Sequence, residues 1–151
     1  MKGFSLTQPW ASLVDLKAKK LETRSWYTGY RGPLVLCAAK GYPKWAQDTF
    51  SEPPFFQALS GRFATAKDLP TGVALCLVNL VACVKTTELH KLEVVQFKPS
   101  VSEIHFGDFS EGRYAWLLEH VRSYAVPLPV KGALGLWEWP VHLPLPGKGG
   151  L

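Results

Sequence analysis

The sequence predicts an α+β fold, a small β-barrel flanked by short helices. With 151 residues, 47% of them hydrophobic and 19% charged, the chain is long enough for one packed core and lacks the composition of a disordered protein. Its 12 prolines and 13 glycines favour many turns between short strands. One or two helical patterns interrupt the strands, with no internal repeat or linker, which points to a single barrel domain. Residues 1–142 are therefore expected to form this domain, followed by a flexible Pro/Gly-rich tail at 143–151.

The first two elements are expected to be a short strand and a helix. Residues 4–8 alternate between apolar and polar side chains, as a half-buried strand does. Thr7 is expected to cap a helix that begins near Pro9, a residue suited to the first helical turn. Apolar residues then recur at helical spacing, and the helix has to end near Leu16 or Lys17 because a charged segment follows at once.

The charged segment Lys19–Trp26 is the unusual part of the sequence. If it is a strand, Glu22, Arg24 and Trp26 share one face because they are spaced by two. Lys19 joins that face only if the chain turns after it. The plain alternative is a solvated edge strand, since lysines on edge strands are ordinary; Lys20 is expected on the surface in either case.

The middle of the chain is predicted to contain two strands and two short helices. Residues 34–39 form a continuous apolar run, typical of a buried strand. Helices are expected at 44–50 and 55–63, separated by two prolines. The longest apolar run, 73–84, predicts a central strand that bends near Asn79.

The last third of the chain predicts two more strands. Residues 98–110 are expected to form a long loop, and 111–118 a strand with alternating faces. The segment 126–130 is expected to be extended but unable to pair fully because of its prolines. Residues 135–139 are predicted to be the final strand.

The net charge and the cysteines limit which ligands and which cellular compartment the sequence predicts. The net charge of +5 and pI near 9.2 permit binding to nucleic acid, nucleotides or other anions without requiring it. Cys37, Cys76 and Cys83 lie in apolar runs without a Cys-x-x-Cys pair, so buried reduced thiols in the cytoplasm are expected. No apolar run approaches the length of a membrane span, and no membrane partner is expected.

Several short blocks resemble one known family. Lys17, Lys19, Glu22 and Arg24 occupy the positions of its Gly-x-Lys-x-x-Glu-x-Arg signature, with Lys17 in place of glycine. Further similar blocks follow in the expected order: residues 5–10, 31–33, 38–40, 112–116 and 135–137. On these blocks the chain resembles the ASCH (activating-signal-cointegrator homology) domain, a PUA-like family. The resemblance implies a PUA-like mixed β-barrel with a ligand cleft beside the signature, and relatives associated with RNA binding, with hydrolysis of acylated cytidine, or similar to a ribonuclease.

Two departures from the family pattern have different consequences. Lys17 falls where a left-handed glycine would end the first helix, so a lysine there is expected to cost about 1 kcal/mol. The acyl-cytidine hydrolases use a Lys-x-x-Thr arrangement with a threonine nucleophile, and this chain has Glu22 at that position. Their mechanism therefore does not transfer directly.

The resemblance and the residue chemistry together give a set of candidate site residues. Arginine and lysine suit phosphate groups, and the predicted phosphate ligands are Lys19, Arg24, Arg113 and Arg62. Aromatic rings stack on bases, and the candidates are Trp10, Trp26, Tyr30 and Tyr114. The alternative roles are core packing for Trp10 and Trp26, and a rim salt bridge of Arg113 with Glu111 or Asp108. If the protein is an enzyme, Lys19 and Glu22 are the catalytic candidates.

The sequence leaves three functions open. The first is a binding protein for RNA, a modified nucleoside or a nucleotide, with Lys19, Glu22, Arg24 and Arg113 in a basic cleft. The second is a hydrolase of the same cleft, either an acyl-cytidine amidohydrolase or a ribonuclease assisted by a divalent metal. The third is a protein-interaction module. No cofactor is certain and no metal spacing is present; His105 with Asp108 is the one pair to examine.

Overall fold

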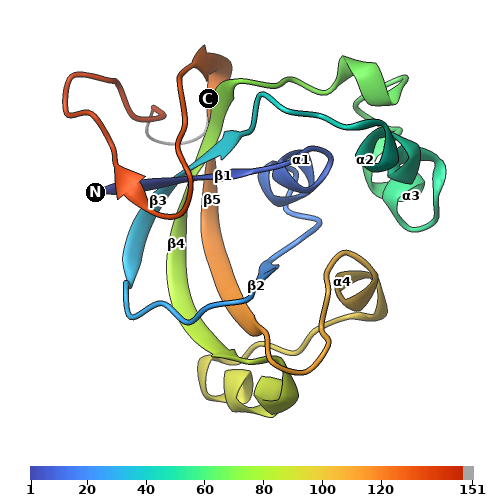
Figure 1. Cartoon of the computed structure of the whole chain (residues 1–151), viewed down its shortest axis with the longest axis vertical. Coiled ribbons are helices and arrows are strands. Elements are labelled where there is room, and N and C mark those ends of the chain that lie inside the picture. The colour runs from blue at the N-terminus through green and yellow to red at the C-terminus, as the bar shows by residue number, and fades with distance from the viewer. Residues whose placement is uncertain (148–151) are drawn as a thin grey trace.

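A computed structural model describes residues 1–147, which form one mixed six-stranded sheet with short helices (Figure 1). The strands are β1 (Lys2–Leu6), β2 (Leu21–Arg24), β3 (Gly32–Ala38), β4 (Val73–Lys85), β5 (Tyr114–Pro129) and β6 (Trp137–Glu138). The helices are α1 (Trp10–Asp15), α2 (Lys44–Asp48), α3 (Phe55–Leu59) and α4 (Val101–His105), with 3-10 helices η1 (Thr49–Ser51), η2 (Ala66–Asp68) and η3 (Thr86–Val95). The predicted α+β class is confirmed.

The strand order in the sheet is β2-β5-β4-β3-β1-β6. β1 runs parallel to β3, and the other neighbouring pairs are antiparallel. The long strands β4 and β5 curve side by side, and α1, α2 and α3 lie to one side of them (Figure 1). Within residues 1–147 the edge strands β2 and β6 do not pair with each other. The expected barrel is therefore a curved sheet that backbone hydrogen bonds do not close.

The main core lies where β1, β3, β4 and β5 meet. It contains Phe4, Leu36 and Trp116, each at most 1% exposed, and the buried side of α1. Residues 34–38 are all buried, as the continuous apolar run predicts. Strand β4 is irregular near Asn79, where its register with β5 shifts on both sides, so the predicted bend coincides with bulges in the ladder.

Helix α1 ends in a Schellman motif at Lys17. Lys17 has a φ of +65°, in the left-handed region. Its amide donates to the carbonyl of Val14, and the amide of Ala18 donates to that of Leu13, the two bonds that define the motif. The left-handed conformation expected at this position is therefore confirmed, with lysine where glycine has no steric cost.

The N-terminal cap of α1 differs from the prediction. The Thr7 side chain makes no capping hydrogen bond. The preceding loop is instead fixed by Gln8, whose Oε1 accepts from the amide of Ser12 at 2.9 Å and whose Nε2 donates to the carbonyl of Pro70 at 2.8 Å. The fully buried side chain of Gln8 therefore satisfies the free amide of Ser12 in the first turn of α1, in place of a cap by Thr7.

Two segments in the second half of the chain differ from what the sequence predicts, and for the first the prediction was wrong. Residues 101–105, expected in a loop, form α4; its N-cap Ser100 accepts from the amide of Glu103 at 3.1 Å. Residues 119–125, for which the sequence pattern predicts no element, continue β5, which runs unbroken to Pro129. Pro127 is tolerated because it falls in an irregular stretch between the paired positions 123 and 128.

Three elements are shorter than predicted. The helix expected at 55–63 ends at Leu59, β2 ends at Arg24 before Trp26, and β6 covers only two residues. Part of the predicted tail is packed, because Tyr124 Oη donates to the carbonyl of Pro144 at 2.7 Å. Residues 148–151 of that tail lie outside the described residues. In the part of the chain that the structure covers, every helix is too short or too polar to cross a bilayer.

Candidate functional site

Strand β2 carries the signature residues at one edge of the sheet. Leu21 is fully buried, whereas Glu22 and Arg24 are half-buried, so burial alternates along the strand as predicted. In the ladder with β5, Glu22 lies opposite Trp116, a main-core residue. The charged face of β2 therefore borders the apolar interior of the curved sheet.

Three charged side chains form a line along this face, which we call the charged triad: Lys19, Glu22 and Arg24. Lys19 is 0% exposed, and its ammonium donates to the carbonyl of Leu21 while lying 3.4 Å from Glu22 Oε1. The other oxygen, Glu22 Oε2, lies 3.2 Å from Arg24 Nε. The turn that brings Lys19 to this face is made by its amide, which donates to the carbonyl of Leu13 at 3.1 Å. Lys20 is exposed.

Arg24 connects β2 to β1 across the opening of the sheet. Its Nη2 donates to the carbonyl of Ser5 at 3.0 Å, although β1 and β2 are not neighbours in the sheet. Its guanidinium carbon lies 5.9 Å from the ring centres of both Phe4 and Trp116. Contacts of this kind contribute about 0.5–1 kcal/mol each at partly exposed sites, so the side chain is held in place from two sides.

Glu103 in α4 holds the start of β2 and has no counterpart among the predicted residues. It is 4% exposed, and its carboxylate accepts from the amides of Lys20 and Leu21 at 2.8–3.1 Å. The sequence signal was present, because Ser100 followed three residues later by Glu103 is a helix-start pattern. The contact with β2 is long-range and has no local signature.

The loop after α4 is tied to β2 through Thr23. The amide of Asp108 donates to Thr23 Oγ1 at 3.2 Å, and Arg113 Nη2 donates to the carbonyl of Thr23 at 3.0 Å. Arg113 Nε also donates to the carbonyl of Asp108 at 3.1 Å and lies 3.5 Å from its carboxylate. Arg113 therefore stands beside β2 and makes the salt bridge with Asp108 that the sequence allowed.

Two tryptophans face the charged residues. Trp10 Nε1 donates to the carbonyl of Phe106 at 2.7 Å, and its ring packs edge-on against Phe55. Trp45 in α2 is 64% exposed, with its ring centre 5.8 Å from that of Trp10. Trp45 was not among the predicted residues; the only signal was a tryptophan in a short polar helix.

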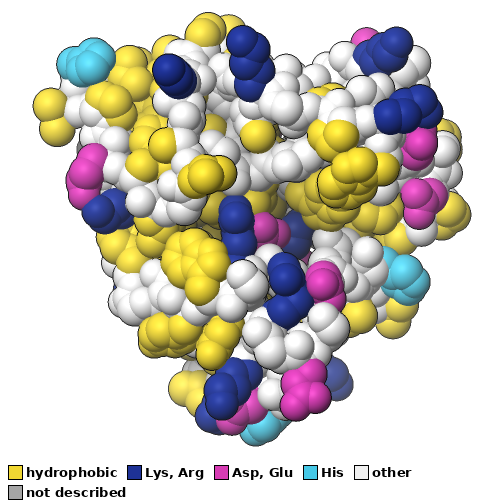
Figure 2. Space-filling model, in the orientation of Figure 1, with side chains coloured by type: hydrophobic (Ala, Val, Ile, Leu, Met, Phe, Trp, Pro, Cys, Tyr) yellow, Lys and Arg dark blue, Asp and Glu magenta, His cyan; other side chains and the backbone are white. Residues whose placement is uncertain are grey.

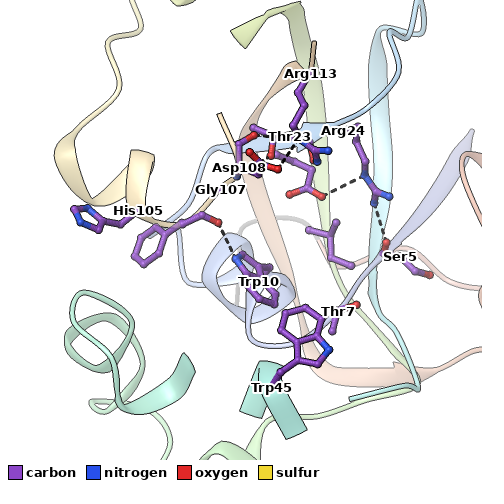
Figure 3. A pocket seen from close by; sticks show the side chains of 13 residues that line it. Ser5, Thr7, Trp10, Thr23, Arg24, Trp45, His105, Gly107, Asp108 and Arg113 are labelled. Carbon is purple, nitrogen blue, oxygen red and sulfur yellow. Dashed lines mark hydrogen bonds and ion pairs between the residues drawn. The ribbon is translucent and has the colours of Figure 1, made fainter. Parts of the chain in front are cut away.

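These groups line one open cleft of about 480 Å³ (Figure 3). Its walls come from β1, β2, α1, α2 and the loop after α4, and its lining residues are Ser5, Leu6, Thr7, Trp10, Glu22, Thr23, Arg24, Trp45, His105, Phe106, Gly107, Asp108 and Arg113. Figure 2 shows the same region as a hollow with acidic and basic side chains at its centre and hydrophobic surface beside it. A volume of this size suits a ligand of about one nucleotide.

Both cleft arginines keep part of their guanidinium unoccupied by protein. Arg24 uses Nη2 for Ser5 and faces Glu22 with Nε, and Arg113 uses Nη2 for Thr23 and Nε for Asp108. Within residues 1–147, Nη1 of each makes no hydrogen bond with protein. A planar guanidinium that is held through Nε and Nη2 and keeps Nη1 free can donate to an anionic oxygen of a ligand.

Several predicted site residues lie elsewhere. Trp26 is 38% exposed and packs edge-on against Trp116, and Tyr30 Oη donates to the carbonyl of Pro33. Tyr114 packs edge-on against Tyr27. None of these rings, nor Arg62, lines the cleft. Lys19 is also absent from its lining and lies behind Glu22.

The pair His105 and Asp108 is the one that the sequence singles out for a metal ion. Both line the cleft, but His105 Nδ1 lies 3.0 Å from the carbonyl of Val101 and its ring points away from the arginines (Figure 3). Hydrogen bonds from the hydroxyl and amide of Ser110 hold the pKa of Asp108 below its ordinary value. Among residues 1–147, no group of three or more His, Cys, Asp or Glu is placed to hold a metal ion.

Comparison with known proteins finds one family and two related proteins. The family model of the ASCH domain matches residues 4–128. Human activating signal cointegrator 1 is 30% identical over 135 residues, which is 89% of this chain and 21% of that protein. The mouse activating signal cointegrator 1 is 29% identical over the same coverage. The chain therefore spans about a fifth of the length of these relatives.

Proposed function

The chain belongs to the ASCH domain family, and from this premise we propose that its cleft binds single-stranded RNA or a nucleotide. Membership of the family favours a nucleic-acid-related role. The net charge of +5 agrees with a polyanionic ligand, which it attracts over long range. Three buried free cysteines suit the reducing cytoplasm that we propose as its location.

One observation carries the proposal: an exposed tryptophan and two partly unoccupied arginines face the same cleft. Trp45 offers a flat, 64% exposed surface backed by Trp10, where a base can stack. Nη1 of Arg24 and of Arg113 can each donate to a phosphate oxygen. This combination of aromatic platform and cationic groups is the usual chemistry of single-strand recognition.

Glu22 supplies a hydrogen-bond acceptor in the same cleft. Its carboxylate lies between Lys19 and Arg24 and is 13% exposed, so it is fixed in position and reachable from the cleft. A carboxylate can accept from the exocyclic amino group of cytosine. We therefore propose that Glu22 contacts the base edge, with Lys19 as a positioning residue behind it.

The test is equilibrium binding of a short fluorescent RNA to four proteins. Trp45→Leu removes the stacking surface and should weaken binding by about 5- to 160-fold, since stacking contributes roughly 1–3 kcal/mol per base. Arg113→Met should lower the steepness of the salt dependence by about 0.7 in log–log slope. Trp26→Leu is the matched control, because Trp26 is also exposed but lies outside the cleft. Equal affinity of the wild-type and Trp45→Leu proteins would contradict the proposal.

In the hydrolase alternative, Glu22 is the general base and Lys19 the second catalytic candidate. Both of its oxygens face protein cations, an arrangement that suits a fixed acceptor better than a base that must take up a proton. The metal-assisted form has no ligand set among residues 1–147. Glu22→Gln separates the two roles: loss of RNA affinity supports binding, whereas retained affinity with lost turnover of acylated cytidine or RNA supports catalysis.

A further inference from the structure

A second, larger groove lies next to the cleft. It has a volume of about 960 Å³ and is formed by the end of β3, the turn before β4 and the segment after β5. Its lining includes Ser5, Lys40, Gly72, Lys131, Gly132 and Leu134. We call it the lysine groove, after Lys40 and Lys131.

Backbone hydrogen bonds hold the walls of the lysine groove together. The amide of Gly72 donates to the carbonyl of Ala38 at 2.9 Å, and the amide of Val130 donates to the carbonyl of Gly72 at 3.2 Å. These bonds join the three wall segments to one another. Gly132 packs so closely on β1 that a Cβ there would lie 2.5 Å from Ser5 Oγ, which fixes the segment after β5 over the sheet.

The groove and the cleft meet at Ser5, which lines both. The carbonyl of Ser5 accepts from Arg24 Nη2, so the arginine that serves the cleft is bonded to the shared wall. The cleft and the groove are therefore adjacent at Ser5, so a ligand longer than the cleft would meet the groove next. Figure 2 shows basic side chains on this face both within the central hollow and above it.

The charge of the groove matches a phosphodiester chain. Lys40 and Lys131 are exposed, and within residues 1–147 neither forms an ion pair. No aspartate or glutamate is among the groove's lining residues, whereas the cleft contains Glu22 and Asp108. Leu134, which is 99% exposed, adds apolar surface against which a sugar or base can pack.

We propose that the lysine groove binds the continuation of a nucleic-acid strand whose first nucleotide occupies the cleft. The substrate class is then a single-stranded oligonucleotide and not a free nucleoside or nucleotide. This inference rests on the proposed function of the cleft and extends it: Lys40 and Lys131 neutralise the phosphates that follow the nucleotide held by Trp45 and Arg113.

The test compares ligand length in the wild type and in Lys40→Ala/Lys131→Ala. Ligands are cytidine monophosphate, a tetranucleotide and an octanucleotide, as RNA and as DNA of the same sequence. The wild type should bind the longer strands more tightly, and the variant should lose that gain while binding the monophosphate equally. Removing two phosphate contacts should lower the steepness of log affinity against log salt concentration by about 1.4 for the octanucleotide. Between roughly 50 and 200 mM salt, the affinity of the variant should therefore fall by a factor about sevenfold smaller than that of the wild type.

Lys85→Ala/Lys98→Ala is the matched control. It removes the same charge from exposed lysines that line neither the cleft nor the groove, and Lys85 ends β4 at the opposite end from Gly72. The inference is overturned if this control and the groove variant weaken the octanucleotide equally, or if an oligoglutamate of equal charge binds as tightly. A wild type that binds the monophosphate in a Trp45-dependent way without a gain from length overturns the groove alone. A wild type that binds none of the nucleotides overturns the proposed function as well.

Equal affinity for RNA and DNA supports the groove, and a preference for RNA assigns the ligand to that class.

Discussion

Replacing Lys19 by methionine should destabilise the protein through the charge that it leaves behind. Lys19→Met keeps an unbranched side chain of similar length, so little cavity forms at this fully buried position. The variant loses the charge-assisted hydrogen bond to the carbonyl of Leu21, worth about 1.5–3 kcal/mol. It also leaves Glu22 with Arg24 as its only cation in the triad.

The size of the effect follows from how far Glu22 remains compensated. Removing one partner of a fully buried ion pair costs about 3–5 kcal/mol. Glu22 is 13% exposed and keeps Arg24 at 3.2 Å, so the expected loss for Lys19→Met is smaller, about 2–3 kcal/mol. Urea denaturation followed by circular dichroism measures it.

A double-mutant cycle identifies the cause. If the lost stability comes from an uncompensated Glu22, then Lys19→Met/Glu22→Gln should be more stable than the sum of the single changes predicts, by about 1–2 kcal/mol. The reasoning is refuted if Lys19→Met is as stable as the wild type, or if the two single changes are additive. Either result would mean that the ion pair between Lys19 and Glu22 carries no net stabilisation.

Other changes give separate expectations. Lys17→Gly should stabilise the protein by about 1 kcal/mol in thermal unfolding, because the position has a φ of +65°, and a loss of stability would contradict the strain. Glu103→Gln should cost about 1.5–3 kcal/mol and speed amide exchange at Leu21, whereas unchanged exchange would mean that the carboxylate does not anchor β2. Burial raises the pKa of Asp15, so the stability linked to its protonated form is fully present below the ordinary value of 3.8 and is lost as pH rises through the raised pKa. The Asp15→Asn variant should therefore have a larger free energy of unfolding than the wild type at neutral pH and an equal one in acid. A stability difference that does not change with pH would contradict this cause. Burial raises the pKa of the Cys37 thiol to about 12, so a thiol reagent at mildly alkaline pH should modify it only after unfolding.

The local features of the site followed from the sequence. Alternation along 21–24 placed Glu22 and Arg24 on one face, and the helix end at Lys17 explains how Lys19 reaches it. These predictions depend on residue spacing and on backbone conformation within about one turn, which a sequence displays directly. The α+β class followed for the same reason.

The long-range features did not follow. Glu103 contacts the amide of Leu21 from 82 positions away, and nothing in the local pattern around either residue indicates the other. Trp45 enters the cleft because α2 packs near α1, a matter of tertiary packing. The opening of the sheet between β1 and β2, bridged by Arg24, likewise depends on the curvature accumulated along β4 and β5.

The central claim is that the cleft between Trp45 and the two arginines is where nucleic acid binds, and the indole N–H signals test it most directly. The chain has six tryptophans, so a ¹⁵N-¹H NMR spectrum assigned with single Trp→Phe variants reports six positions at once. Addition of a short RNA should shift the Trp45 and Trp10 signals and leave in place that of Trp26, which lines neither the cleft nor the lysine groove. Shifts at Trp137 and Trp139 with an unchanged Trp45 would contradict the account.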